Sequence, residues 1–350
     1  MKHRKKVLMC GSDLSVKGGM VSVIRNYLNY QNWEDIAIHY VPTYIEKSKI
    51  VIALYFLIAY IRVLFHLIFG KYDVLYVHTA ERGSFYRKAM LVELAHKFGV
   101  KTVIHHHAAE FEEFYSSSNR KEYLKKILEL ADLNIVLSNR LIRMITDKAP
   151  KSNVKVLYNA VKTYPENPYN QDATNILFLG RFGKRKGIYD LLVALREIES
   201  ELDTSVKLYL CGDGEIDEVK NKVEEYGLEN RVEHVGWIEG KQKIEFFKNS
   251  MVNILPSYNE GLPMTILETM SYGIPNISTK IASIPEVIVD GVNGYMIKPG
   301  DIEALKKLLL EISADKKKRI DMSNLAYRCV MDSFSLSHHI GLLSEYLREL

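Results

Sequence analysis

The chain has 350 residues, of which 47% are hydrophobic and 26% are charged, and its formal net charge at pH 7 is +4. This length suits two domains that each bury a core, and the composition is that of a globular protein rather than of a disordered one. The nearly balanced charge gives no case for nucleic acid as a partner.

The cysteines and the N-terminus bear on the compartment. Cys10, Cys211 and Cys329 are isolated and form no CxxC pair, which indicates a reducing compartment. The basic N-terminus leads into a short apolar run that ends at Gly11, and this pattern is more typical of a first β-strand than of a signal peptide. We therefore expect a cytoplasmic protein.

The first half of the chain alternates short β-branched runs with helical patterns. The expected strands are Lys6–Cys10, Ile36–Tyr40, Val74–His78, Thr102–His106, Leu133–Leu137 and Val154–Leu157. The expected helices are Met20–Tyr30, Ile50–Phe69, Arg87–Phe98, Arg120–Leu130 and Asn139–Lys148. This alternation favours a parallel sheet covered on both faces, so residues 1–163 are predicted to form one Rossmann-like domain.

One expected helix, Ile50–Phe69, is almost wholly apolar and long enough to span a bilayer. It carries Arg62 and His66, which are costly inside lipid. The segment is interpreted as a helix buried against the sheet, with a helix lying on a membrane surface as the second possibility. A true span is disfavoured because the next segment, Tyr72–His78, reads as another strand of the same sheet.

A polar segment with two prolines, Thr163–Asp172, interrupts the alternation and is interpreted as a domain linker. The pattern then restarts over residues 174–334. The expected strands are Asn175–Leu179, Val206–Cys211, Val232–His234, Val252–Leu255, Pro275–Ser278 and Gly294–Ile297. The expected helices are Ile188–Ile198, Ile216–Tyr226, Lys241–Asn249, Pro263–Ser271 and Ile302–Ser313. The fold class is thus α/β, with two doubly wound domains whose strand ends border a ligand cleft.

Two glycine-rich turns each lie between an expected strand and an expected helix. Residues 180–187 read Gly-Arg-Phe-Gly-Lys-Arg-Lys-Gly. Glycines allow close backbone approach, and a helix N-terminus with adjacent cations favours an anion such as a diphosphate. A solvated basic turn is the alternative, since the spacing is neither the P-loop nor the GxGxxG pattern. Gly18-Gly19 is a weaker candidate of the same kind in the first domain.

Two carboxylates, Glu260 and Glu268, flank the expected start of a helix. Gly261, Leu262 and Pro263 form the strand-to-helix junction, with Pro263 expected in the first turn. On a continuous helix eight residues make about two turns, which would put both acids on one face. They could hold hydroxyls of a ligand. Spacing alone slightly favours the other interpretation, a helix-terminal acid plus an exposed glutamate.

Three adjacent histidines, His105, His106 and His107, end an expected strand of the first domain. Consecutive strand residues point to opposite faces, so adjacent histidines are not a ready metal triad and no metal site is expected. One of them could donate a hydrogen bond into the cleft. No HExxH pattern or Ser-His-Asp order suggests a hydrolase.

Residues 256–275, Pro-Ser-Tyr-Asn-Glu-Gly-Leu-Pro-Met-Thr-Ile-Leu-Glu-Thr-Met-Ser-Tyr-Gly-Ile-Pro, resemble the E-x7-E block and following turn of the family 4 glycosyltransferases. Other matches in order are Gly180-Arg181, Lys186-Gly187, residues 212–214, 285–288 and 290–301, with Asn159-Ala160-Val161 where the family usually has Asn-Gly-Val. The resemblance implies the GT-B fold, two Rossmann-like domains facing a central cleft. It makes 1–163 the acceptor-side domain, 174–334 the nucleotide-sugar domain and 335–350 a helix that crosses back.

The resemblance also implies residue roles. Arg181 and Lys186 would neutralise the leaving diphosphate of a nucleoside-diphosphate sugar, with a UDP-sugar favoured. Glu260 would bind the donor sugar and Glu268 the nucleotide ribose. His107 best matches the family's first-domain histidine, although Ala108 replaces the usual glycine and leaves His105 as an alternative. The donor-binding positions are Gly18, Gly19, Gly180, Gly212, Gly214, Gly261, Leu262, Pro263, Met264, Thr265 and Glu268.

Family resemblance further implies transfer with retained anomeric configuration, without metal or other cofactor, which fits leaving-group stabilisation by fixed positive charge. The sequence from His105 to Phe111 resembles enzymes of bacterial capsule, exopolysaccharide or O-antigen synthesis, whose acceptors are saccharides, often linked to polyprenyl diphosphate. Ile50–Phe69 with flanking Lys47, Lys49 and Lys71 would then suit peripheral docking on an anionic inner membrane face.

Two other functions share this architecture. A nucleotide-sugar 2-epimerase has the same double-Rossmann shape, but the linked Glu260–Glu268 block and the membrane-like helix favour transfer. A non-catalytic nucleotide-sugar-binding protein is disfavoured because the donor-site positions are filled.

Overall fold

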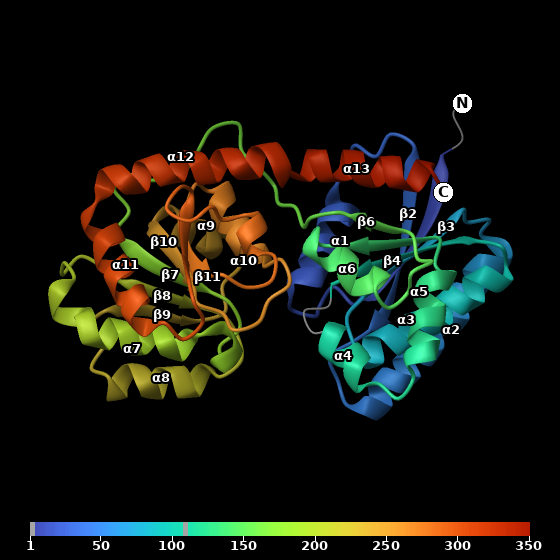
Figure 1. The fold of residues 1–350 in the computed structure, drawn as a ribbon, viewed down its shortest axis with the longest axis horizontal. Helices are drawn as coiled ribbons and strands as arrows, with labels where there is room; N and C mark the ends of the chain where they lie inside the picture. Colours follow the sequence, from blue (N-terminus) through green and yellow to red (C-terminus); the bar gives the residue numbers. More distant parts are fainter. Residues whose placement is uncertain (1–3, 108–110) are drawn as a thin grey trace. The chain divides into compact units, whose positions relative to one another are not determined.

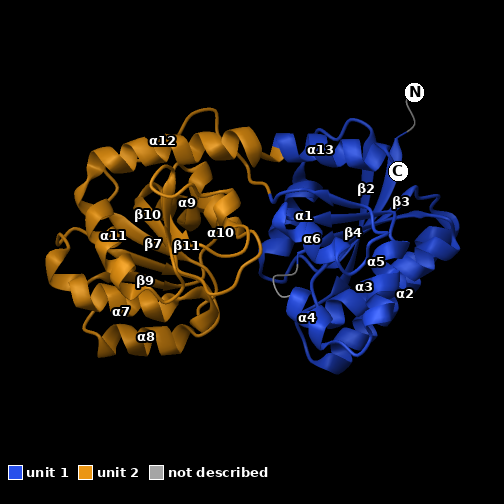
Figure 2. Cartoon of the chain, viewed as in Figure 1, with its two compact units in different colours: residues 1–159, 337–350 blue, residues 160–336 orange. Residues whose placement is uncertain are grey.

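A computed structural model of the protein describes residues 4–107 and 111–350. Ala108, the position where the sequence departs from the family glycine, lies outside the described residues. The chain divides into two compact units, residues 1–159 with 337–350 and residues 160–336 (Figures 1 and 2). The change of unit at Asn159–Ala160 places the whole segment 163–172 in the second unit.

The first unit is built on a six-stranded parallel sheet with strand order β2-β1-β3-β4-β5-β6. Its strands are β1 (Lys5–Ser12), β2 (Ile36–Tyr44), β3 (Val74–Thr79), β4 (Lys101–His106), β5 (Leu133–Val136) and β6 (Val154–Val156). Its helices are α1 (Gly19–Asn29), α2 (Lys49–Phe69), α3 (Gly83–Lys97), α4 (Phe111–Ser117), α5 (Lys121–Leu130), α6 (Arg140–Thr146) and α13 (Leu336–Arg348). Helices cover both faces of this sheet, as the alternating pattern predicts (Figure 1).

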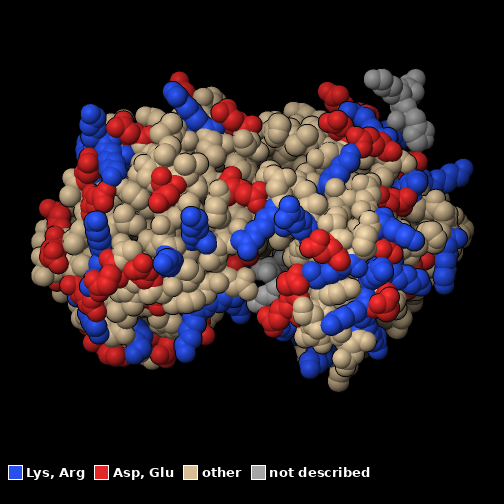
Figure 3. Space-filling view, in the orientation of Figure 1, with Lys and Arg blue, Asp and Glu red and all other residues tan. Residues whose placement is uncertain are grey.

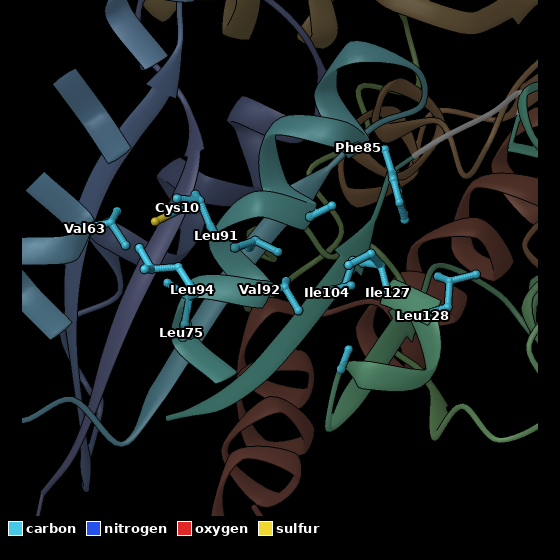
Figure 4. Packing of buried hydrophobic residues seen from close by; sticks show 14 of the residues in the cluster. Cys10, Val63, Leu75, Phe85, Leu91, Val92, Leu94, Ile104, Ile127 and Leu128 are labelled. Atoms are coloured by element: carbon cyan, nitrogen blue, oxygen red, sulfur yellow. The ribbon is translucent and has the colours of Figure 1, made fainter. Parts of the chain in front are cut away.

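The core of the first unit forms where strand side chains meet helices α2, α3 and α5. Figure 4 shows Leu75 and Ile104 from the sheet packed among Val63, Val92 and Ile127 from these helices. Burial of β-branched and leucine side chains on both sheet faces is the main source of stability in such a layer arrangement. Cys10 lies in this same cluster, where it packs as a small apolar side chain, and it forms no disulfide bond.

Helix α2 is formed as predicted, but only one of its faces is buried. Phe56, Ala59, Val63 and Leu67 pack inward, while the opposite face is exposed to solvent. The prediction that the helix is buried against the sheet is therefore wrong for most of its surface. Among the described residues, α2 is the one helix long and apolar enough to cross a membrane. The strands on either side of it both pair with β1, which argues against a span.

The second unit repeats the architecture with strand order β12-β11-β10-β7-β8-β9, again all parallel. Its strands are β7 (Asn175–Leu179), β8 (Leu208–Cys211), β9 (Val232–Gly236), β10 (Ser250–Leu255), β11 (Asn276–Thr279) and β12 (Gly294–Ile297). Its α-helices are α7 (Ile188–Ile198), α8 (Ile216–Glu225), α9 (Gly240–Lys248), α10 (Met264–Ser271), α11 (Ile302–Ala314) and α12 (Lys316–Ser333). Short 3-10 helices are Lys184–Lys186, Glu199–Glu201 and Ile284–Glu286.

Two helices were missed from the sequence. Helix α4 has only seven residues, and α12 carries a highly basic start that weakens its apolar periodicity. The polar segment before β7 is non-helical, as predicted, but it packs closely: the ring of Tyr164 lies 4.8 Å from that of Tyr272. The Tyr169 hydroxyl donates to the Met251 carbonyl. Helix α13 packs on the first unit, where Lys5 donates to the carbonyl of Leu347.

Candidate active site

In the second unit, the loops that follow β7 and β10 are joined by hydrogen bonds at the carboxyl ends of neighbouring strands. The Tyr258 amide donates to the Arg185 carbonyl at 2.8 Å, and the Arg185 guanidinium donates to the Asn259 carbonyl at 3.0 Å. Gly187 stands in the same loop as Arg185 and has a φ of +72°. A Cβ on Gly187 would lie 2.1 Å from the Pro256 carbonyl oxygen. Only glycine allows this left-handed turn and close approach together.

The junction of these loops holds a buried ion pair. The Nζ atom of Lys186 lies 2.5 Å from Glu260 Oε1, and the Ser257 hydroxyl donates to the same oxygen at 2.7 Å. Burial lowers the pKa of the Lys186 ammonium; Glu260 opposes this shift and Arg185 adds to it. The two hydrogen bonds described for Glu260 both go to Oε1, so Oε2 is available to accept from a ligand hydroxyl.

Glu260 is followed by the N-terminus of α10. The helix begins at Met264, and Pro263 is its N-cap rather than a residue of its first turn, so the expectation for Pro263 is wrong by one position. Pro263 itself makes no side-chain capping hydrogen bond at this terminus. The Thr265 hydroxyl oxygen is buried without a hydrogen-bond partner among the described residues. By helix geometry the first amides of α10, those of Met264 and Thr265, lack intrahelical partners, so this terminus presents donors suited to a phosphate.

Glu268 lies within α10, as predicted, and Glu260 lies before it. Because the helix starts four residues after Glu260, the two acids are not on one continuous helix and the shared-face argument does not apply. Glu268 instead pairs with Lys243 of α9 at 2.9 Å, and both side chains are partly exposed. The two carboxylates are thus held by different lysines, Lys186 with its side chain 14% exposed and Lys243 with its side chain 30% exposed.

The other candidate glycines of the second unit, Gly180, Gly212 and Gly214, lie where the loops after β7 and β8 touch. A Cβ on Gly212 would lie 1.9 Å from the Gly180 carbonyl oxygen, so this glycine is required for loop packing itself. The Phe182 amide donates to the Asp213 carbonyl at 2.6 Å, and Phe182 forms a β-bridge with Gly214. Arg181, on the same loop, is exposed. The packing supports its position without contacting its charged end.

In the first unit, Gly18 and Gly19 lie at the start of α1, which follows β1 as predicted. Gly18 is the N-cap with φ +141, and a Cβ there would meet no heavy atom within 4 Å. The turn therefore needs glycine for its backbone conformation and leaves open space over the helix terminus.

The three adjacent histidines divide between the two faces of the sheet, as the strand alternation predicts. The His106 ring points to Asn134, whose side-chain oxygen lies 3.0 Å from Nε2. His105 and His107 lie on the other face together with His78 of β3, and His78 Nδ1 lies 2.9 Å from His107 Nε2. These three side chains each offer a ring nitrogen, and the nitrogens lie within 4.8 Å of one another.

Of the two candidate histidines, His107 reaches the surface and His105 does not. The His105 side chain is fully buried, whereas His107 is half-buried at the end of β4. Burial, with smaller contributions from His106 and His339, lowers the pKa of His107 to about 3. The ring is therefore neutral at physiological pH and can donate or accept a hydrogen bond without carrying charge.

Two family models match the chain. One described as Glycosyltransferase Family 4 matches residues 22–164, and one described as Glycosyl transferases group 1 matches residues 162–328. The chain belongs to glycosyltransferase family 4. It is a glycosyltransferase, and its two doubly wound units are the two domains of the GT-B fold.

Relatives of this glycosyltransferase agree with that assignment. An uncharacterized 41.2 kDa protein in the cps region of Klebsiella pneumoniae is 28% identical over 69% of this chain and 69% of its own length. The lipopolysaccharide 1,6-galactosyltransferase of Salmonella typhimurium is 32% identical over 49% of this chain and 50% of its own, so the alignment spans about half of that enzyme. The crystal structure of HepE from Anabaena in complex with UDP shares the fold, with a TM-score of 0.76 at 17% identity over 99% of this chain and 100% of that one.

Several residues of the glycosyltransferase site were not singled out from its sequence. Ser257 and Lys243 hold the two glutamates, and His78 joins His105 and His107 from a separate strand. Ser257 had a local signal, because it stands three residues before Glu260. His78 and Lys243 had no such local signal, because only strand pairing and helix packing bring them close to the other site residues.

Surface charge on the glycosyltransferase is mixed. In the view of Figure 3, basic and acidic side chains are interspersed over both units. This distribution accords with the small net charge.

Proposed function

We propose that the protein moves a sugar from a UDP-sugar to a saccharide, or to a saccharide linked to polyprenyl diphosphate, in the synthesis of a bacterial surface polysaccharide. Transfer retains the anomeric configuration and uses no metal ion or cofactor. The buried pair of Lys186 and Glu260 beside the N-terminus of α10 carries this proposal. The UDP complex of HepE and the lipopolysaccharide relative support the donor and the pathway.

The chemistry follows from where charge develops. When the bond from the sugar's anomeric carbon to the diphosphate breaks, negative charge builds on the departing oxygens. Lys186, the exposed Arg181 and the first-turn amides of α10 are fixed positive groups that stabilise this charge. Glu260 Oε2 accepts from a donor-sugar hydroxyl, and Glu268 accepts from the ribose hydroxyls after exchanging its contact with Lys243.

His107 and the Gly18-Gly19 turn are the first-unit contributions to the proposed reaction. Gly18-Gly19 allows the diphosphate to approach the N-terminus of α1 closely. His107, neutral and half-buried, donates a hydrogen bond to the donor sugar.

The apolar face of α2 supports a membrane-embedded acceptor. Its exposed side chains recur at helical spacing, with Ile50 75% and Phe69 67% exposed. The members of this face are Ile50, Val51, Leu54, Leu57, Ile58, Ile61, Phe65, Ile68 and Phe69. Lys47, Lys49, Arg62 and Lys71 are exposed along and beside it. An apolar helix face with cations around it lies in the interface of an anionic membrane, which would place the enzyme on the inner face of the cell membrane.

Nucleotide binding tests the donor proposal. UDP, GDP and ADP are compared by thermal shift, and a ligand that binds the folded state raises its melting temperature. We expect UDP to give the largest increase and Lys186→Met to abolish most of it. Radiolabelled UDP-sugars are then incubated with and without a membrane extract. Label transferred to lipid-linked material supports the proposal, whereas an epimerised sugar formed from the donor alone contradicts it.

Vesicle co-sedimentation tests the membrane contact. The wild type is expected to bind vesicles of phosphatidylglycerol more than neutral phosphatidylcholine, and Leu57→Ser/Ile61→Ser/Phe65→Ser is expected to lose this binding. Ile244→Ser/Leu325→Ser removes exposed apolar side chains from α9 and α12 and serves as the matched control. Equal binding by the wild type and the triple variant would contradict the contact.

A further inference from the structure

The histidine cluster of the first unit has a geometry that the transfer reaction does not use. His78 and His105 are fully buried at the carboxyl ends of β3 and β4, and His107 follows β4 at the surface. Their ring centroids lie 4.2 to 5.2 Å apart in all three pairs. The buried Nε2 of His105 has no hydrogen-bond partner within the described part of the chain. Buried polar atoms without partners are rare in folded proteins and call for an explanation.

Buried hydrogen bonds orient the rings around His105. His339 Nδ1 lies 2.6 Å from the Tyr158 carbonyl oxygen, which can only accept, so this nitrogen bears the hydrogen. The Nε2 of His339 then holds a lone pair and accepts from the Tyr27 hydroxyl at 2.5 Å. The Tyr27 ring packs edge to face against the ring of Tyr76, with 6.4 Å between their centroids.

Tyr76 is the side-chain partner that orients His105. The Nδ1 of His105 lies 2.7 Å from the Tyr76 oxygen. In the tautomer whose Nδ1 donates to Tyr76, the Nε2 of His105 holds a lone pair in a buried position beside the rings of His78 and His107. A neutral imidazole whose other nitrogen donates to a fixed oxygen is how proteins orient a metal ligand.

We propose that His78, His105 and His107 form a binding site for one divalent transition-metal ion of the zinc class. Zinc takes imidazole nitrogen at about 2.0–2.1 Å, and tetrahedral geometry then puts its ligand nitrogens about 3.3 Å apart. The 2.9 Å contact between His78 Nδ1 and His107 Nε2 is within a few tenths of an ångström of that separation. When the ion binds, the ring that carries the hydrogen of this contact takes it on its other nitrogen, so both facing nitrogens offer lone pairs, and three histidines leave a fourth position for water.

Because His107 lies at the surface, an ion can reach the site from solvent, and its binding affects the transfer reaction. An ion bound there occupies the ring that the proposed transfer reaction uses, so zinc inhibits transfer rather than assisting it. The proposal concerns ion binding and does not depend on transfer. Lys88 lies near His78, and burial lowers the pKa of Lys88 to about 7; its ammonium form opposes a second positive charge. Removing its charge should therefore tighten zinc binding.

Zinc binding is measured on the chelator-treated full chain by competition with a chromophoric chelator. We expect one ion per chain. His78→Gln and His105→Gln should each weaken binding by at least about 100-fold, and Tyr76→Phe by about 10–100-fold, the range for partners that orient a ligand. Lys88→Met should strengthen it. His106→Gln is the matched control, because His106 is equally buried on the other face of the sheet, and it should bind zinc like the wild type.

Cobalt substitution tests the same site without altering the protein. Co²⁺ bound to three imidazoles and a water gives the visible absorption of a tetrahedral site, and zinc should displace it in a one-to-one titration. Absence of this absorption in the wild type would overturn the proposal even where a histidine variant fails to fold. Zinc binding that His78→Gln leaves unchanged in a folded variant would overturn it as well.

Discussion

Lys186 Nζ lies 2.5 Å from Glu260 Oε1, and the two side chains are 14% and 5% exposed. The pair joins the loop before α7 to the loop before α10, so one contact fixes both halves of the proposed diphosphate site. A buried ion pair is weak evidence for stability, because desolvation offsets much of its Coulomb energy. Breaking one side of it, however, leaves an uncompensated buried charge.

The pair allows stability and catalysis to be separated. Lys186→Met should lower the free energy of unfolding by about 3–5 kcal/mol, because Glu260 is left buried and unpaired. The double variant Lys186→Met/Glu260→Gln should recover most of that loss. Both should lose about 10²–10³-fold in kcat, the usual effect of removing one fixed group that stabilises developing charge. Urea unfolding and steady-state kinetics measure the two effects, and a double variant that regains activity would contradict the assigned role of Lys186.

Nucleotide affinity should fall at alkaline pH. The charged ammonium attracts the diphosphate, and burial holds the pKa of Lys186 below its usual 10.5. The attractive form is therefore lost at a lower pH than for an exposed lysine, so the dissociation constant for UDP should rise at alkaline pH values below 10.5. Lys186→Arg keeps its charge throughout this range. Calorimetry should give a flat profile for Lys186→Arg, and an equal pH dependence in both proteins would point to another group.

Sequence reasoning predicted the local features better than the long-range ones. Most strands and helices begin and end within a few residues of their predicted positions, because burial on both sheet faces produces continuous apolar runs that periodicity detects. The sequence also predicted the loop that carries Lys186, and it predicted that Glu260 lies before the helix that is α10. The partners Lys243 and His78 were not, because their contacts are fixed by packing between elements distant in the chain. The exposed face of α2 was misjudged because apolar composition alone does not say what covers it.

The turn before α7 should tolerate no side chain at Gly187. Alanine there would adopt a left-handed conformation and place its Cβ 2.1 Å from the Pro256 carbonyl oxygen. Gly187→Ala should therefore cost more than the roughly 1–2 kcal/mol of left-handed backbone alone. Gly227→Ala is the control, since Gly227 has a similar φ of +67 but open space around it, and it should cost only that backbone term. Similar urea midpoints for the two variants would contradict the steric argument.

Truncating a side chain should destabilise the protein strongly on the buried face of α2 and hardly at all on its exposed face. Phe56 is buried in the core of the first unit, so Phe56→Ala should lower the free energy of unfolding by about 3–5 kcal/mol. Ile61 is exposed on the same helix, and Ile61→Ala should change it by less than about 0.5 kcal/mol. Urea unfolding in the absence of lipid makes the comparison, and a large loss for Ile61→Ala would mean that the face is buried in solution. If the exposed face adds nothing to folding, its continuous apolar surface requires another explanation, and contact with a membrane supplies one.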